Sequence, residues 1–275
     1  MKKSLVAISV IGVLLASPAL AAPPPPPPVA PACFWWCGPY VGLNAGGAWG
    51  ANSTASFSGN AAAAPFFAAN EFPTTLSLNP SGFIGGVQVG YNWLVAPWVV
   101  VGLEADIQGS GYRGSATASP TPGLAFVPFT TTIEEHGNWF GTVRPRVGFL
   151  ALPNLLVYGT GGLAYGQAEI SFNAIATGFT LATCPGNFTC TSGSSSSVRL
   201  GWAAGAGLEW MFLPHWSLKA EYLFVDLDPS ATGTSTACCI ITTFTATTQF
   251  RENIVRAGVN WNFWFDPWVA PIITK

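Results

Sequence analysis

Nine ionisable residues fall inside apolar stretches of this chain, and each keeps the phase opposite to its hydrophobic neighbours. Glu104 and Asp106, for example, alternate with Leu103, Ala105 and Ile107. Acids and bases that share one face can neutralise one another in ion pairs, and here five bases stand against four acids. We therefore expect a nearly neutral ionic network, formed by Glu104, Asp106, Arg144, Arg146, Arg199, Glu209, Lys219, Glu221 and Arg256.

The two histidines are the other candidates for chemistry. His136 follows Glu134 and Glu135, so a Ser–His–acid site with a loop serine can be imagined. The chain has no G-x-S-x-G nucleophile motif, however. We expect His136 and its two acidic neighbours to be solvated, and His215 to be solvated in a tight turn. The sequence therefore predicts a protein without catalytic residues.

The charged residues belong to segments in which apolar side chains recur every second residue. A period of two is typical of a β-strand with two different faces. Each segment has roughly the 9–11 residues that a tilted strand needs to cross a bilayer. The expected strands are residues 40–49, 83–93, 98–109, 138–149, 155–166, 198–210, 216–225 and 254–263.

The connections between these strands alternate in length. Bacterial outer-membrane barrels have short periplasmic turns and long outer loops, and an even strand count leaves both termini on the periplasmic side. The long connections are rich in Ser, Thr, Ala and Gly, and we expect them to be mobile loops at the cell surface. The tight connections are 94–97, 150–154 and 211–215, and the long ones are 50–82, 110–137, 167–197 and 226–253.

The composition favours a surface that meets lipid. Charged residues make up 8% of the chain and the mean hydropathy is +0.40, whereas a soluble domain has about 25% charged residues. An Arg or Lys on the lipid face costs about 2–4 kcal/mol at the midplane, so the charges must face inward. We expect an all-β fold: an eight-stranded antiparallel transmembrane up-and-down barrel with long extracellular loops. The formal net charge of −2 gives no support for a nucleic-acid partner.

Aromatic residues cluster at the ends of the expected strands, as the two interfacial girdles of a membrane barrel require. A soluble β-sandwich would not predict this clustering. The expected periplasmic girdle contains Trp93, Trp98, Phe149, Trp210, Trp216, Trp261 and Phe263, and the outer girdle contains Trp49, Phe83, Trp139, Tyr165, Trp202 and Phe224.

The N-terminal residues predict export from a bacterial cytoplasm. Lys2 and Lys3 precede the apolar stretch 5–16, and an A-x-A cleavage site follows at 19–21. A proline run comes next and predicts a stiff linker without a core. The expected organisation is a signal peptide at 1–21, a Pro-rich periplasmic linker at 22–37, the barrel at 38–263 and a C-terminal periplasmic extension at 264–275.

Six cysteines lie outside the expected strands, in a compartment that favours disulfides. Their spacing favours Cys33 with Cys37 and Cys184 with Cys190, while the neighbouring pair Cys238 and Cys239 could join one outer loop to another. A metal site built on these thiols would need histidines nearby, and none are present. We therefore expect neither a metal nor a cofactor.

Eight segments carry a family resemblance: YVGLNAG (40–46), GGVQVGYNW (85–93), GLEADIQGS (102–110), WFGTVRPRVG (139–148), VYGTGGLAYG (157–166), GAGLEW (205–210), WSLKAEY (216–222) and VRAGVNWNF (255–263). In this order they resemble the small eight-stranded outer-membrane barrels of alphaproteobacteria, called porin-family or outer-membrane immunogenic proteins. That group is similar in architecture to the membrane domain of outer membrane protein A. The long connections show no such match.

The resemblance implies contacts with outer-membrane lipids and with the barrel-assembly machinery. It assigns the assembly signal to the last strand, with Val255, Val259, Trp261 and Phe263. In this family the chain usually ends at that aromatic, whereas here residues 264–275 follow. Pro145 stands where glycine is more usual and predicts a local bulge, because proline removes one ladder donor.

Three functions are compatible with this sequence. The first is a structural outer-membrane barrel and surface antigen, with an ion-paired, largely plugged lumen. The second is a narrow diffusion channel like a porin, for which the abundant glycines leave room. The third is a surface protein whose loops bind haem or mediate adhesion. The sequence leaves a surface ligand and self-association open.

Overall fold

The computed structural model describes most of the chain that follows the proline run. The expected signal peptide and C-terminal extension lie outside the described residues, as do Cys33, Cys238 and Cys239. The described residues are 36–51, 53–121, 129–176, 180–181, 184–185, 188–227, 233–236, 243–248 and 250–263.

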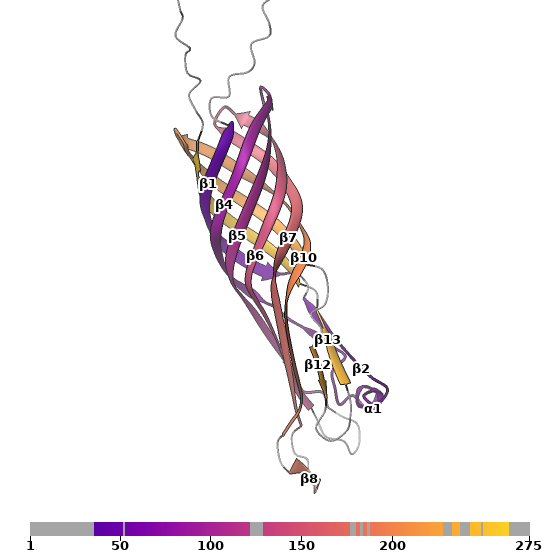
Figure 1. Ribbon diagram of the computed structural model, residues 1–275. Helices are drawn as coiled ribbons and strands as arrows, with labels where there is room; N and C mark the ends of the chain where they lie inside the picture. Colours follow the sequence, from indigo (N-terminus) through magenta and orange to yellow (C-terminus); the bar gives the residue numbers. More distant parts are fainter. Residues whose placement is uncertain are drawn as a thin grey trace, which may run out of the picture. The chain divides into compact units, whose positions relative to one another are not determined.

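Eight antiparallel strands close into a barrel (Figure 1). Consecutive barrel strands are neighbours, and β1 closes the ring against β14, in the order β1-β14-β11-β10-β7-β6-β5-β4. This up-and-down topology confirms the expected fold class. The barrel strands are β1 (Gly38–Gly50), β4 (Ser81–Ala96), β5 (Val99–Ala118), β6 (Phe129–Leu152), β7 (Leu155–Ala176), β10 (Phe188–Leu213), β11 (Trp216–Leu227) and β14 (Phe250–Asn262).

A smaller sheet, here called the cap, lies at the end of the barrel opposite the tight turns. It has the strand order β12-β13-β2-β3 and carries the short helix α1 (Figure 1). The tight turns are periplasmic in barrels of this type, so the cap is on the extracellular side. Its elements are β2 (Thr54–Gly59), α1 (Ala64–Ala68), β3 (Thr75–Ser77), β12 (Gly233–Thr236) and β13 (Thr243–Thr247), and a separate small sheet contains β8 (Thr180–Leu181) and β9 (Cys184–Pro185).

Four barrel strands are much longer than the sequence pattern predicts. β5, β6, β7 and β10 contain 20, 24, 22 and 26 residues, because their ladders continue beyond the expected membrane segments. The expectation of long mobile loops is therefore wrong for the described parts of those connections. Cys184 lies in β9 and Cys190 in β10, which also corrects the placement of these cysteines in loops.

The apolar face of these strands changes from the outward side to the inward side along the chain. On β7, Leu163 is exposed on the outward face within the expected membrane segment. Further along, Ile170 and Phe172 are buried on the inward face, while Ser171 and Asn173 alternate with them. Lipid outside the barrel explains the first pattern, and water outside a packed interior explains the second. A sequence search for strands with an apolar outward face therefore does not find the extensions, because their apolar residues face inward.

Pro145 does not bend its strand. Val143 pairs with Leu163 and Arg146 pairs with Thr160 in one unbroken register, so the bulge expected at Pro145 is wrong. The Thr160 hydroxyl donates a hydrogen bond of 2.9 Å to the Pro145 carbonyl, which adds a side-chain link across the gap in the ladder.

In the described part of the chain, no helix is long and apolar enough to span a membrane.

An arginine substituted on the outward face of β5 tests where the lipid-facing part of that strand ends. We expect Leu103→Arg to destabilise the protein by about 2–4 kcal/mol, because the charge would face hydrocarbon near the midplane. Ser115→Arg, on the outward face of the extension of the same strand, should change stability by less than about 0.5 kcal/mol. Urea unfolding in lipid vesicles measures both variants. Equal losses of stability would show that the boundary is misplaced.

Candidate functional site

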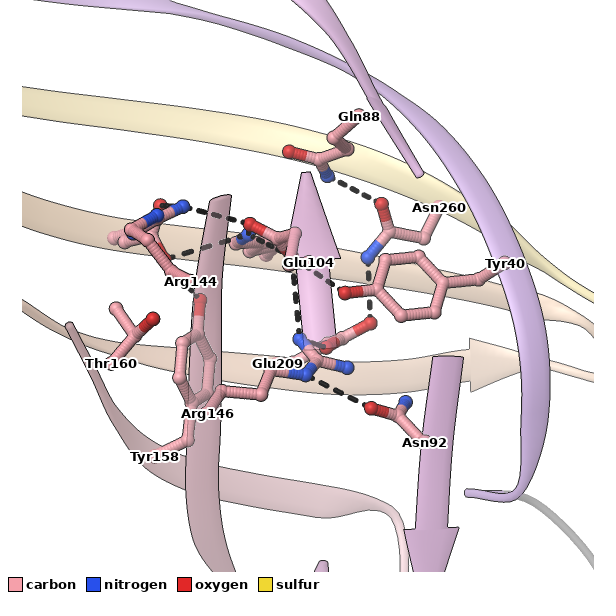
Figure 2. Close-up of polar contacts among 12 residues, drawn as sticks. Tyr40, Gln88, Asn92, Glu104, Arg144, Arg146, Tyr158, Thr160, Glu209 and Asn260 are labelled. Carbon is pink, nitrogen blue, oxygen red and sulfur yellow. Dashed lines mark hydrogen bonds and ion pairs between the residues drawn. The ribbon is translucent and has the colours of Figure 1, made fainter. Parts of the chain in front are cut away.

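Glu104 of β5 is the centre of a buried ionic network in the barrel lumen (Figure 2). Its carboxylate oxygens lie 2.6 Å from Lys219 Nζ and 2.9 Å from Arg144 Nη2. Arg146 Nη1 and Arg256 Nη2 each lie 3.6 Å from an oxygen of the same carboxylate. Four bases from β6, β11 and β14 therefore converge on one acid of β5.

Asp106 and Glu221 extend the network toward β11 and β14. Asp106 Oδ2 lies 3.0 Å from Arg144 Nη2 and 2.9 Å from Arg256 Nη2. Arg256 Nε donates a hydrogen bond of 2.8 Å to Glu221 Oε2. Lys219 Nζ lies 3.5 Å from Glu221 Oε1, so each of these three bases contacts at least two carboxylates.

Glu209 and Arg146 form a second arm of the network. Arg146 Nη1 lies 2.9 Å from Glu209 Oε2, and Arg146 Nε donates a hydrogen bond of 2.9 Å to Asn92 Oδ1. The other oxygen of Glu209 accepts hydrogen bonds from Ser217 at 2.6 Å and from Asn260 at 2.7 Å. Neutral side chains thus satisfy the carboxylate oxygen that no base reaches.

Two tyrosines that the sequence analysis did not identify complete the network. The Arg146 guanidinium lies over the Tyr40 ring at 4.7 Å and the Tyr158 ring at 5.2 Å. Tyr40 donates a hydrogen bond of 2.7 Å to Glu104, and Tyr158 donates one of 3.0 Å to Glu221. The available signal was their phase: Tyr40 is in step with Gly42, and Tyr158 is out of step with the outward-facing Leu163.

Lumen glycines provide the room for these long side chains. A Cβ atom on Gly90 would lie 2.3 Å from the Tyr40 ring, and one on Gly42 would lie 2.1 Å from Asn260 Oδ1. Real side chains do not approach so closely, so the tyrosine and the amide occupy the space that a Cβ would take.

The network contains eight of the nine expected residues, and Arg199 is the exception. Arg199 faces inward on β10 opposite Gly166, but it forms no ion pair with any described residue. Without it, four bases face four acids, and all eight are at most 5% exposed. The charges of the network therefore balance without Arg199.

A tryptophan that precedes β1 packs at the end of the barrel that carries the tight turns. The indole N–H of Trp36 donates a hydrogen bond of 2.9 Å to the carbonyl of Pro153, in the turn between β6 and β7. Trp36 is buried, and it packs with Val100, Leu156 and Met211.

The aromatic core of the cap packs against the strands at the opposite end of the barrel. Phe72 and Phe244 stack with ring centroids 4.5 Å apart. Phe57 contacts Phe172 of β7 edge to face at 6.2 Å, and this core continues into the barrel through residues such as Ile133.

Two expectations around the histidines are wrong, those for Glu135 and for His215. Glu134 and His136 lie on the outward face of β6, 3.6 Å apart, but Glu135 is fully buried on the inward face. His215 stacks on Trp261, with ring centroids 5.4 Å apart, instead of being merely solvated. Packing against Trp261 gives His215 a neighbour that the local sequence does not contain.

The remaining site residues are placed as follows. Cys37 Sγ accepts a hydrogen bond of 3.3 Å from the Leu94 amide, and the cysteine pairings stay predictions because the side chains of the other five are not described. The expected assembly-signal residues form the exposed apolar face at the end of the last strand: Val255, Val259, Trp261 and Phe263.

Removing one base should be far more costly inside the network than beside it. We expect Arg144→Met to destabilise the protein by about 3–5 kcal/mol, because it leaves carboxylates buried without their partner. Arg199→Met, on the same inward side but without an ion pair, should cost less than about 1 kcal/mol. Urea unfolding of both variants in lipid vesicles measures the difference, and similar losses would contradict the network.

Comparison with known proteins places the chain in a family. The family model described as outer membrane protein beta-barrel domain matches residues 12–263. The 31 kDa outer-membrane immunogenic protein of Brucella melitensis is 35% identical over 237 residues, which cover 84% of this chain and 85% of the relative. The 22 kDa outer membrane protein of Rhizobium leguminosarum bv. viciae is 30% identical over 145 residues, covering 53% of each chain.

Among solved structures, the outer membrane protein OprG from Pseudomonas aeruginosa matches with a TM-score of 0.42 and 10% identity, covering 83% of this chain and 98% of OprG. The family model spans most of the present chain, and the Brucella relative exceeds 30% identity over most of both chains. The chain therefore belongs to the outer membrane protein β-barrel family and resides in the bacterial outer membrane.

Proposed function

We propose that this protein is a structural outer-membrane barrel and surface antigen with a plugged lumen and no catalytic activity. The observation that carries the proposal is the ionic network, in which eight fully buried or nearly buried charges bridge strands across the lumen. A side-chain network of this kind leaves an eight-stranded barrel without an open path, because such a barrel is just wide enough for side chains to fill.

Three closures in series support the plugged lumen. Trp36 covers the periplasmic end, the network fills the middle, and the phenylalanines around Phe72 cover the extracellular end. An ion that crosses the barrel would have to displace all three. The network is also neutral, so it offers no net charge that would favour ions of one sign.

The long strand extensions support the role of surface antigen. They present polar outward faces beyond the outer girdle, as on β7 with Ser171 and Asn173. The name of the Brucella relative describes that protein as immunogenic, which is the behaviour expected of exposed hairpins.

The outward faces support two partners. Residues such as Leu43, at 67% exposure, and Phe83, at 69%, would contact outer-membrane lipids. The apolar face of β14 that ends at Phe263 would serve as the signal that the barrel-assembly machinery reads during biogenesis.

Planar-bilayer recordings of the purified full chain test the plug against a narrow diffusion pore. We expect no steady single-channel currents, because the three closures leave no continuous aqueous path. A triple variant with Trp36→Ala, Arg146→Ser and Glu209→Ser removes one closure and a neutral part of the network. The rest of the network and the cap remain, so this variant should stay silent as well.

Steady currents from the unmodified protein would show that it is a pore. If neither protein conducts, the triple variant must still be shown to be a folded barrel by its migration on gels with and without boiling. A folded and silent triple variant would mean that the remaining lumen charges and the cap are sufficient to close the barrel.

A further inference from the structure

A second acidic cluster lies in the lumen on the extracellular side of the ionic network. Glu135 of β6, Glu252 of β14 and Tyr112 of β5 are all buried on the inward face. β14 and β6 stand on opposite sides of the ring, and the charge of Glu252 acts on Glu135 across the lumen. A Cβ atom on Gly137 of β6 would lie 3.9 Å from Glu252 Oε1 and 3.6 Å from Tyr112 Cδ1.

A shift in register brings Glu135 into this cluster. The pairing of β6 with β7 slips between Gly137 and Phe140. Beyond that point the inward face of β6 passes from even-numbered to odd-numbered residues, so Glu135 is buried while Glu134 remains exposed. Tyr112 is the cross-strand partner of Gly137, which places the phenol ring beside the slip.

The cluster lacks the partners that its buried atoms need. Both carboxylate oxygens of Glu135 and the hydroxyl of Tyr112 are inaccessible and have no hydrogen-bond partner. Within the described residues, no base forms an ion pair with Glu135 or Glu252. Burying a carboxylate is costly unless it is neutralised and hydrogen-bonded, so this arrangement is incomplete as it stands.

Protons or a bound cation can neutralise the two acids. Glu135 and Glu252 lie just beyond the expected membrane segments 138–149 and 254–263. Burial, reinforced by the charge of Glu252, raises the pKa of Glu135 to about 8, and burial raises the pKa of Glu252 to about 7. The pKa of Tyr112 is also raised, by burial and then by the charges of Glu252 and Glu135, so its hydroxyl stays protonated.

We propose that Glu135 and Glu252 bind one Ca²⁺ ion between them, with oxygen ligands from the two carboxylates and from water, and with the Tyr112 hydroxyl donating a hydrogen bond within the site. A site made only of oxygens selects hard cations and disfavours zinc or copper. Two rigid strands on opposite walls suit Ca²⁺ better than Mg²⁺, which demands near-ideal octahedral geometry.

The composition of the site sets the expected affinity. Among the described residues, no three histidines, cysteines or carboxylates are arranged to hold a metal ion, so the cation must draw its other ligands from neutral oxygens. Few charged ligands predict weak binding, with a dissociation constant of about 10⁻⁴–10⁻³ M, as in extracellular calcium modules. Protons compete for the same oxygens, so binding should strengthen as the pH rises through the two pKa values.

Isothermal titration calorimetry with CaCl₂ tests the site. The full chain, refolded in detergent with a chelator that is then removed, is titrated at about pH 9 and about pH 6. We expect one Ca²⁺ per chain at the higher pH and an affinity at least about tenfold weaker at the lower pH, since each pH unit below a pKa costs up to tenfold. MgCl₂ should bind more weakly than CaCl₂.

Three variants locate the bound ion. Glu135→Gln and Glu252→Gln each remove one carboxylate with little change in shape, and both should abolish binding. Glu134→Gln removes the exposed carboxylate next to Glu135 and should leave it unchanged. Gel migration with and without boiling shows that each variant is folded, and having two variants on different strands protects the test if one does not fold.

Two outcomes would overturn the proposal. Equal binding by the unmodified protein and both buried-site variants would place the ion elsewhere on the surface. Absence of binding at about pH 9 would also overturn it. If stability then falls as the pH rises from about 4.5 to about 8, the two acids share a proton instead.

Discussion

The lumen of this barrel cannot solvate a lone charge, and that constraint organises the membrane-spanning half of the molecule. Lipid surrounds the barrel, and eight strands leave little room for water inside. Each of the eight network charges is therefore stable only beside a charge of the opposite sign. The alternation of the strands follows from this requirement, because a slip of one residue would move a whole row of charges into hydrocarbon.

The register of the strands shows how the constraint is met. Glu104 stands directly opposite Arg144 on β6, and Glu221 stands directly opposite Arg256 on β14. Such cross-strand pairs hold adjacent strands in place. Lys219 reaches beyond its own partner to Glu104, so the same charges also link strands that are not neighbours. The network thus fills the interior of the barrel and also fixes the register of the strands.

The sequence was sufficient to predict the barrel and most of the network, because both depend on local alternation. Lipid outside and charge inside produce a pattern that can be recognised strand by strand. The partners within the network were not predictable, since they depend on how eight strands are staggered. Arg199 shows the limit: its phase is correct, but its height on β10 places it beside Gly166 and away from the acids.

Prediction failed where the solvent outside the strands changes. Above the membrane the barrel wall is apolar inside and polar outside, so residues around Ile170 follow the opposite rule from residues around Leu163. The register slip after Gly137 also changes which residues of β6 face inward, and no residue type in that segment predicts the slip. Both errors have one cause, because a face can be assigned from sequence only when its surroundings are already known.

The barrel contains two sets of buried acids, which differ in whether bases of the chain surround them. Glu104 is buried within the expected membrane segment of β5, and four bases of the chain itself surround it. Glu135 and Glu252 lie toward the cell surface, and the described chain offers them no base. Within the described residues, the inward-facing bases that form ion pairs all lie in the expected membrane segments. Beyond that depth a mobile cation or a proton can provide the neutralisation, so the chain has less need to supply a fixed positive charge there.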